Sequence, residues 1–282
     1  MSQPTHGPYS PAPAVVNEGA GNYPAIIRNW QRFLVVGCIH STRACPVAVD
    51  SIVAFILRWK PHVVVINGDL LDLEAFMGSV KDRDGVEPIA DDVDEGIRIL
   101  NRIADACIAV GAHLVFNEGN HEARLWRAIS SNNETAAFAA FKIQQDMKQA
   151  VRRAGGTYIE YRGIWKGYLL GATCLVTHGS VYNVNAARDM AMAYCLRGIS
   201  TVIFNHTHSP GWAIGNRDDA PMGINGGHLQ RRAHPAASYA DGRLKTFSWM
   251  PGCAFGEFAD DACVPQLYVH PLALDGQPWR LP

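Results

Sequence analysis

Five short apolar segments of the chain each lead into side chains that can bind a metal ion. The first, at 32–36, leads through Gly37 into Cys38 and His40. The other four lead into the following residues: Asp69, Asn120, His121, His178, His206 and His208. Thiolate, imidazole and carboxylate groups are the usual protein ligands of transition metals. Their recurrence after apolar segments points to a metal site.

The apolar segments themselves have the length and composition of buried strands, rich in Val, Leu and Ile. They lie at 32–36, 61–67, 112–116, 174–177 and 201–204. Between the first two, apolar residues at helical spacing predict a helix at 48–59, which ends before Pro61. A strand–helix–strand unit gives a parallel pair, and open α/β sheets bind ligands at the carboxyl ends of such strands. Cys38 and His40, two apart on an extended segment, therefore face one common point.

The remaining chain has the patterns of further helices and strands. Helices are expected at about 91–110, 123–129, 135–154 and 183–196, and strands at 158–161, 167–177, 243–250 and 266–270. The last two strands would flank a loop containing Gly, Cys and Asp. Asp91 and Asp92 suit a solvated helix N-terminus, which we favour over a second cation site there.

The ordered series of blocks resembles the calcineurin-like metallophosphoesterase family. That family has the motifs D-x-H, G-D-x-x-D, G-N-H-[DE], a lone His before Gly, and G-H-x-H. The matching blocks here are Gly37–His40, Gly68–Asp72, Gly119–Glu122, His178–Gly179 and Asn205–His208. The resemblance implies an α/β fold, a four-layer α/β/β/α sandwich built on two mixed β-sheets.

The resemblance also implies two divalent metal ions and the residues that hold them. The first ion would be bound by Cys38, His40, Asp69 and His208, and the second by Asp69, Asn120, His178 and His206. Asp69 would bridge the two ions. His121 would contact the substrate phosphate and protonate the leaving oxygen, so that Asp69 and His121 are the expected catalytic residues. Asp72 and Glu122 would orient His121 or the loops.

The implied activity is hydrolysis of a phosphomonoester or phosphodiester by a hydroxide that bridges the two metal ions. The expected partner is a phosphate-ester substrate, with a nucleotide or a nucleic acid as one candidate. A nuclease, or a phosphodiesterase that processes nucleic-acid ends, is the alternative within this class. Gly119–Glu122 followed by Ala123-Arg124-Leu125 is also similar to compact phosphoesterases of phage and bacterial genomes.

Two positions depart from the family pattern. Cys38 stands where the family has Asp, as it does in the RNA lariat debranching enzymes, and a soft thiolate favours Zn²⁺ or Fe²⁺ over Mn²⁺ at the first site. A metal-binding scaffold with little activity, because Cys38 replaces Asp, is the alternative from another class. Asn205 stands where the family has Gly, and Asn is the next most tolerant residue for a left-handed backbone.

Several other residues have an ordinary structural interpretation beside a functional one. His62 and His113 are expected to be strand histidines rather than ligands. His228 and His234 lie in a segment that either shapes the substrate mouth or is solvated. Four tryptophans are expected in the core or at its rim, with a stacking platform for a base as the sharper alternative: Trp126, Trp165, Trp212 and Trp249.

Composition sets wider bounds on the function. With 282 residues, 48% hydrophobic content and a net charge of −1, the chain has ample core material and no global charge that attracts nucleic acid or a membrane. Its seven cysteines lack CxxC spacing, which favours the reducing cytoplasm. No apolar run reaches the roughly 18 residues that cross a bilayer, so no membrane partner is expected. Residues 1–24 are expected to form a flexible arm and 25–282 a single catalytic domain.

Overall fold

The computed structural model describes residues 29–77, 88–161, 167–231 and 249–282. The arm predicted at 1–24 and most of the strand predicted at 243–250 lie outside these residues. So do His234 and Trp165.

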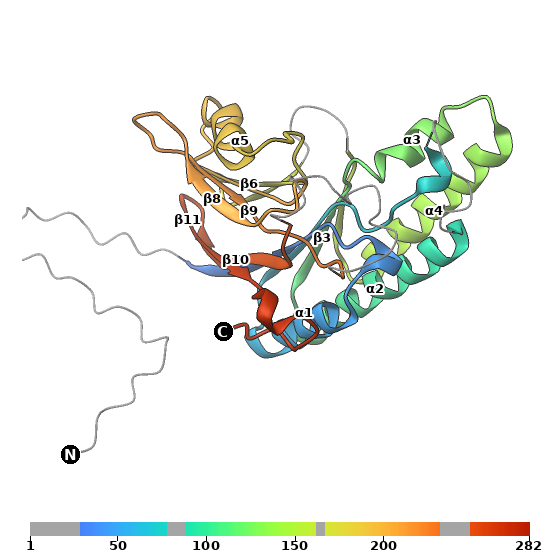
Figure 1. Cartoon of the computed structure of the whole chain (residues 1–282), viewed down its shortest axis with the longest axis horizontal. Helices are drawn as coiled ribbons and strands as arrows, with labels where there is room; N and C mark the ends of the chain where they lie inside the picture. The colour runs from blue at the N-terminus through green and yellow to red at the C-terminus, as the bar shows by residue number, and fades with distance from the viewer. Residues whose placement is uncertain (1–28, 78–87, 162–166, 232–248) are drawn as a thin grey trace, which may run out of the picture.

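Two mixed sheets form the centre of the molecule (Figure 1). The first sheet has the order β11-β10-β1-β2-β3-β4. Strands β1, β2, β3 and β4 are parallel to one another, and β10 is antiparallel to both of its neighbours, β1 and β11. Its strands are β1 (Gln31–Val36), β2 (Val63–Asn67), β3 (His113–Asn117), β4 (Thr157–Ile159), β10 (Gly252–Ala259) and β11 (Ala262–Val269).

The second sheet has the order β5-β6-β7-β9-β8. Its middle strands β6, β7 and β9 are parallel, and β5 and β8 run antiparallel at the two edges. The strands are β5 (Gly167–Leu170), β6 (Cys174–Thr177), β7 (Thr201–Phe204), β8 (Gly211–Ile214) and β9 (Met222–Asn225).

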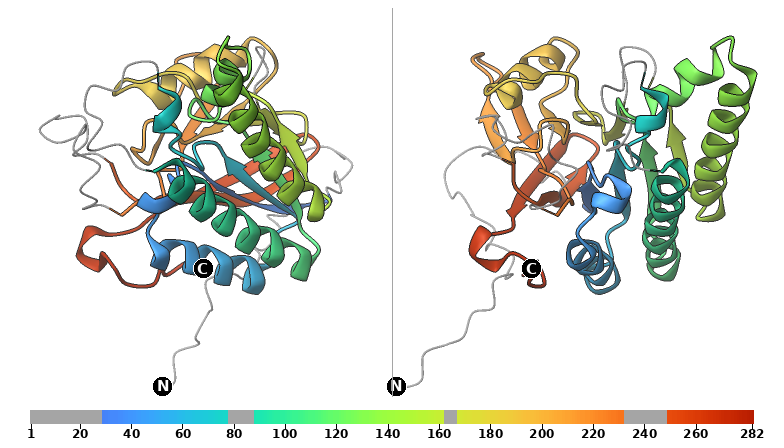
Figure 2. Two further views of the ribbon diagram at one scale, coloured as in Figure 1. Left: turned by 90° about the vertical axis from the view of Figure 1, so that its right-hand side faces the viewer. Right: turned by 45° about the vertical axis from the view of Figure 1, so that its right-hand side comes forward.

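Helices cover the outer face of each sheet, as Figure 2 shows from two sides. Helices α1, α2 and α4 pack on the first sheet and α5 packs on the second, while α3 lies beside α4. The helices are α1 (Pro46–Trp59), α2 (Ile89–Val110), α3 (Ala123–Ile129), α4 (Glu134–Arg153) and α5 (Ala186–Cys195). The predicted four-layer α/β/β/α sandwich is confirmed.

Strand β1 shows why the sequence gives these layers. Leu34 and Val36 face the core under the helices, whereas Phe33 and Val35 face the core between the two sheets. Side chains alternate along a strand, so a strand buried on both faces must be apolar at every position. The continuous apolar run of β1 follows from that requirement.

Two strand predictions differ from the structure. The single strand expected at 167–177 is the hairpin β5–β6, which turns at Gly171, a glycine with φ of 62°. The loop expected after residue 250 is strand β10, which pairs with both β1 and β11. This strand was not predicted because its sequence contains glycines, which are not typical of strands. In the structure, a Cβ on Gly256 would lie 2.2 Å from the carbonyl oxygen of Val264 on β11. Glycine is therefore required for close pairing at this point, although it is disfavoured in strands generally.

The topology of the two sheets brings the loops that contain the candidate ligands to the carboxyl ends of the parallel strands. Because β1, β2 and β3 are parallel neighbours, the segments that follow them leave the sheet at the same end. The segments after β6 and β7 leave the second sheet in the same way. Among the described residues, no helix is both long and apolar enough to span a membrane.

Candidate metal centre

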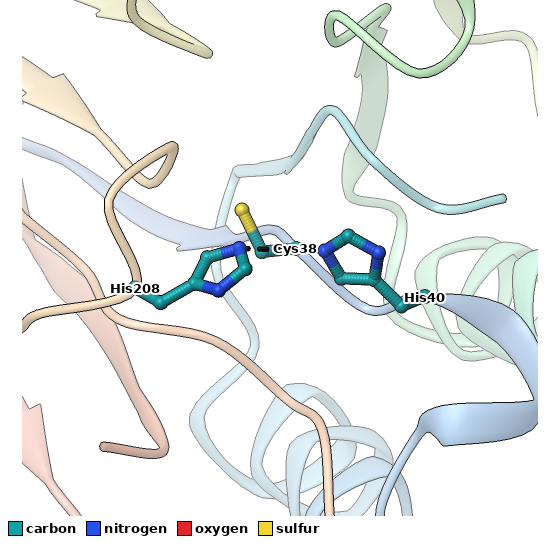
Figure 3. A group of neighbouring side chains, drawn as sticks. All are labelled: Cys38, His40 and His208. Atoms are coloured by element: carbon teal, nitrogen blue, oxygen red, sulfur yellow. Dashed lines mark hydrogen bonds between the residues drawn. The ribbon is translucent and has the colours of Figure 1, made fainter. Parts of the chain in front are cut away.

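Three residues from two sheets form the first group of candidate ligands. Cys38 and His40 follow β1, His208 follows β7, and their ligand atoms all lie within 4.8 Å of one another. Figure 3 shows the two imidazoles approaching from either side of Cys38, with their Nε2 atoms 3.4 Å apart. All three side chains are buried.

Asp72 sets the tautomer of His40. The Nδ1 atom of His40 lies 2.8 Å from Oδ1 of Asp72, so Nδ1 carries the proton and Nε2 presents its lone pair to the group. Burial alone would raise the pKa of Asp72, but His40, His121 and Arg43 lower it well below its ordinary value. A carboxylate behind a ligating imidazole is a recurrent support of metal sites.

The second group is built around His178. Its Nε2 atom lies 2.9 Å from Oδ1 of Asn120, 3.1 Å from Oδ2 of Asp69 and 3.2 Å from Nδ1 of His206. Its other ring nitrogen, Nδ1, lies 3.0 Å from the carbonyl oxygen of Asn67 and donates to it. Nε2 of His178 therefore faces two acceptor oxygens and a second imidazole nitrogen, an arrangement that needs a positive charge among these atoms.

The pKa shifts in the second group show that positive charge is favoured at His178 and disfavoured at His206. Burial would lower the pKa of His178, but the Asp69 carboxylate raises it above its ordinary value. Burial, and then the charge of His178, lower the pKa of His206 to about 4. A single proton cannot serve four converging donor atoms, whereas a metal ion accepts four ligands. The donor set therefore fits a divalent cation.

Cys38 is common to both groups. Its sulfur and the ligand atoms of Asp69 and His178 also lie within 4.8 Å of one another. Burial first, and then the carboxylates of Asp69 and Glu122, raise the pKa of the Cys38 thiol well above its ordinary value. The sulfur thus lies in the middle of the centre and loses its proton only when a cation compensates the charge.

The backbone is strained where it presents these side chains. Cys38, His40, Asp69 and His208 all have left-handed φ angles, between 51° and 59°. Such angles cost non-glycine residues about 1–3 kcal/mol each and cluster at functional sites. Backbone bonds hold the strained loops together: Cys38 N–H donates to the Gly68 carbonyl at 2.9 Å and His40 N–H to that of Asp69 at 3.0 Å.

Glu122 fixes the position of the Asp69 loop. Its buried carboxylate accepts four backbone N–H groups, at 2.8–3.1 Å, from Asp69, Leu70, Leu71 and Gly119. Burial, and then the Asp69 carboxylate, raise the pKa of Glu122 to about 7, and these N–H donors act in the opposite direction. Glu122 therefore ties the segment after β2 to the segment after β3.

The open side of the centre is made by three half-buried residues, Asn120, His121 and His206. His121 is 16% exposed, with Nε2 3.9 Å from Oδ2 of Asp69 and Nδ1 3.4 Å from Oδ1 of Asp72. Its backbone N–H donates to Oδ1 of Asp69 at 3.0 Å. A substrate entering the centre would meet His121 before the buried ligands.

Asn205 acts through its side chain rather than through a left-handed backbone. It is absent from the described residues with positive φ, so the tolerance expected for this position is not what the fold uses. Its buried amide accepts from Asn67 Nδ2 and donates to the Gly227 carbonyl, both at 2.9 Å. Asn117 donates in turn to Asn67 at 2.9 Å. This chain of three asparagines links the two sheets directly below the centre.

Two supporting residues, Asp92 and Arg43, were misjudged or missed at the sequence level. Asp92 is buried, not solvated, and accepts from the backbone N–H groups of Asp72 at 3.0 Å and Leu73 at 2.7 Å. Buried Arg43 pairs with Asp72 at 3.2 Å and with Glu74 at 2.7 Å. The Asp72 segment is thus held from both sides. An isolated Arg and one acid of an acidic run carry no local signal of burial.

His62 and His113, which were expected to be strand histidines, lie in neither ligand group. His62 accepts the Arg32 N–H at 2.9 Å, and His113 contacts the Thr157 hydroxyl at 2.9 Å. His228, expected either to shape the substrate mouth or to be solvated, is buried behind His208, with ring centroids 5.5 Å apart, and accepts the Gln230 N–H. The Arg124 side chain donates to the carbonyl of Asp72, so it braces the same loop.

Comparison with known proteins agrees with this architecture. The family model described as calcineurin-like phosphoesterase matches residues 31–219, and the chain belongs to this family. Its members are metal-dependent phosphoesterases, and the candidate ligand groups described above all lie within residues 31–219. No curated protein matches the chain.

Solved structures similar to this chain include the following two. The crystal structure of TT1561 of Thermus thermophilus has a TM-score of 0.38 and 8% identity, over 85% of this chain and 98% of that one. The structure titled GAP50, the anchor in the inner membrane complex of Plasmodium, has a TM-score of 0.35 and 11% identity, over 86% and 88% of the two chains.

Proposed function

We propose that the protein is a hydrolase that cleaves a phosphate ester with two divalent metal ions. The observation that supports this most directly is the convergence of Asn120 Oδ1, Asp69 Oδ2 and His206 Nδ1 on His178 Nε2, at 2.9–3.2 Å. The first ion would be held by Cys38, His40 and His208, and the second by Asn120, His178 and His206. Asp69 and Cys38 lie where a ligand could be shared between the two ions.

When bound there, the ions supply an activated water as nucleophile and neutralise charge on the phosphoryl oxygens. The thiolate of Cys38 favours Zn²⁺ or Fe²⁺ at the first position, with Mn²⁺ as the harder alternative. The water oxygen attacks phosphorus, the P–O bond to the leaving alcohol breaks, and the leaving oxygen takes up a proton.

His121 is the proposed proton donor to the leaving oxygen. Its Nε2 atom faces the centre beside Asp69, and it belongs to the open side where a substrate would enter. Its Nδ1 atom faces Asp72 at 3.4 Å from Oδ1, so the ring is oriented with Nε2 towards the centre. Asp72 is in turn fixed by Arg43 and by its N–H bond to Asp92. The chain therefore positions the proton donor through Asp72 and through the bond from the His121 N–H to Asp69.

The proposal is tested with p-nitrophenyl phosphate and bis-p-nitrophenyl phosphate, in the presence of Mn²⁺, Zn²⁺ or Fe²⁺. We expect turnover by the wild type and a loss of about 10²–10⁴-fold in kcat in His121→Ala, the range typical of a general acid. The metal content of His121→Ala should equal that of the wild type, since His121 is not a proposed ligand. His62→Ala is the control, because His62 is exposed and remote from the centre.

Two outcomes would contradict the proposal. Absence of turnover with all three metals would favour a metal-binding scaffold, in which Cys38 in place of Asp removes activity. Equal turnover by His121→Ala and the wild type would exclude His121 as the proton donor. Cleavage of single-stranded or branched nucleic acid, with a steep salt dependence, would instead support the nuclease alternative.

A further inference from the structure

An aromatic-walled cavity of about 570 Å³ adjoins the centre. It lies between the beginning of α5, the beginning of β8 and the segment after His208, and Tyr182, Trp212 and Trp249 contribute its three aromatic rings. Ligand pockets for small organic molecules have volumes of about 300–1,000 Å³ and are mostly apolar. The cavity therefore has room for an organic group of nucleoside size.

Two aromatic walls of the cavity contact proposed ligands of the centre. The ring of Tyr182 is 5.9 Å from that of His206, and the ring of Trp249 is 4.4 Å from that of His208, centroid to centroid. Thr207, between the two histidines, lines the cavity as well. A phosphoryl group at the centre would thus carry its ester group directly into the cavity.

The walls of the cavity suit a flat, aromatic ring. Trp212 is 63% exposed although it lies on a strand, so its indole face is available to a ligand. Base–aromatic stacking is tolerant of base identity because every base has a π face. Asn185 also lines the cavity, and its side chain makes no capping hydrogen bond to α5, so its amide can meet the polar edge of a base.

A second, smaller cavity reaches the centre from a different loop. It has about 340 Å³ and is lined by Asn120, Trp126 and Tyr161, with Arg127 at its edge. Asn120 and His206 are both neighbours of His178 Nε2, so the two cavities meet the same phosphoryl position through different residues. A monoester has one organic group and would use only one of them. Two cavities at one phosphoryl position fit a diester.

We infer that the substrate is a nucleotidyl phosphodiester, whose base stacks in the cavity formed by Tyr182, Trp212 and Trp249 while its other ester group lies over the cavity beside Asn120. This inference rests on the proposed function and names the substrate class of the same site. Trp212 would be a specificity residue, since it contacts the base and not the reacting atoms.

Three substrates that release the same chromophore test the inference. They are the p-nitrophenyl ester of thymidine 5′-monophosphate, methyl p-nitrophenyl phosphate and p-nitrophenyl phosphate. We expect kcat/KM for the thymidine ester to exceed that for the methyl ester at least about tenfold, and Trp212→Ala to lower this ratio about tenfold, as loss of one stacked base predicts. Trp30→Ala is the matched control, since Trp30 is 39% exposed and lines neither cavity.

An equal rate for the thymidine and methyl esters would overturn the inference, and so would a preference for the monoester over both diesters. Calorimetry on the metal-loaded protein separates this result from failure of the proposed function, because it needs no turnover. We expect adenosine 5′-monophosphate to bind about tenfold more tightly than inorganic phosphate, and Trp212→Ala to remove the difference. Equal binding of the two would overturn the inference even if the protein hydrolyses all three esters.

Discussion

The Nε2 atoms of His40 and His208 lie 3.4 Å apart in the buried part of the centre, although the two residues are 168 positions apart in the chain. Burial, and then the charge of His40, lower the pKa of His208 well below its ordinary value. His208 is therefore held neutral, which is the form that binds a metal. Two imidazoles facing each other beside a thiol define the first proposed ion site.

Removing one of these imidazoles should empty one site and spare the other. We expect His40→Ala to lower the metal content of the purified protein by the occupancy of the first site, because the second group keeps all its members. Metal content is measured by mass spectrometry after extensive dialysis. His62→Ala is the control, as His62 is an exposed histidine outside both groups. Unchanged metal content in His40→Ala would contradict the assignment of this site.

Cys38 should leave a spectroscopic signature of its own. In protein loaded with Co²⁺ we expect a thiolate-to-cobalt charge-transfer band in the near ultraviolet, since a thiolate is a soft ligand. Cys38→Ser should remove the band, and Cys38→Asp should also shift metal preference from Zn²⁺ towards Mn²⁺. The matched control is Cys45→Ser, which lies in neither ligand group. Persistence of the band in Cys38→Ser would show that Cys38 is not a ligand.

The sequence could predict the strands that carry Cys38 and Asp69 because each is a continuous apolar run followed by glycine. It could also predict that their loops meet, since parallel neighbouring strands end at one edge of a sheet. These inferences depend only on local pattern and on general rules of topology. The α3 bounds, 123–129, were predicted from local pattern in the same way and are confirmed.

The supporting contacts could not be predicted in this way because they join distant segments. Asn205 bonds Asn67 across 138 positions, and the Glu122 carboxylate accepts N–H groups more than 50 positions away. No local pattern specifies which backbone amide an acid will meet. Strand β10 was missed for a related reason, because Gly256 is explained only by the nearness of β11.

Glu122 should contribute to stability as well as to the position of Asp69. In Glu122→Gln one side-chain oxygen is replaced by an NH₂ group that faces N–H donors, leaving buried donors unpaired. We expect the free energy of unfolding to fall by about 2–4 kcal/mol, since each unpaired buried group costs about 1–3 kcal/mol. Urea denaturation of the metal-free protein measures this free energy.

Glu257→Gln is the control, because Glu257 is exposed on β10. It should change the free energy of unfolding by less than about 0.5 kcal/mol. Equal stability of both variants would contradict the role of Glu122.

His228 should make the metal-free protein sensitive to acid. Burial, and then the charge of His40, lower its pKa to about 3, and its Nδ1 atom can take up a proton only by losing the N–H bond from Gln230. An unfolded histidine is protonated below about pH 6.5, so between pH 6.5 and 3 the folded state binds fewer protons than the unfolded state. The free energy of unfolding therefore falls as the pH is lowered through this range, by up to about 1.4 kcal/mol per pH unit.

The variant His228→Asn keeps an acceptor for the Gln230 N–H and removes the titration. Its free energy of unfolding, measured in chelator, should therefore fall less steeply than that of the wild type as the pH is lowered from 6.5 to 4.5. His62→Asn is matched, because His62 also accepts a backbone N–H at Nδ1 but is exposed, and it should follow the wild type. Identical slopes in wild type and His228→Asn would refute this origin of the acid sensitivity.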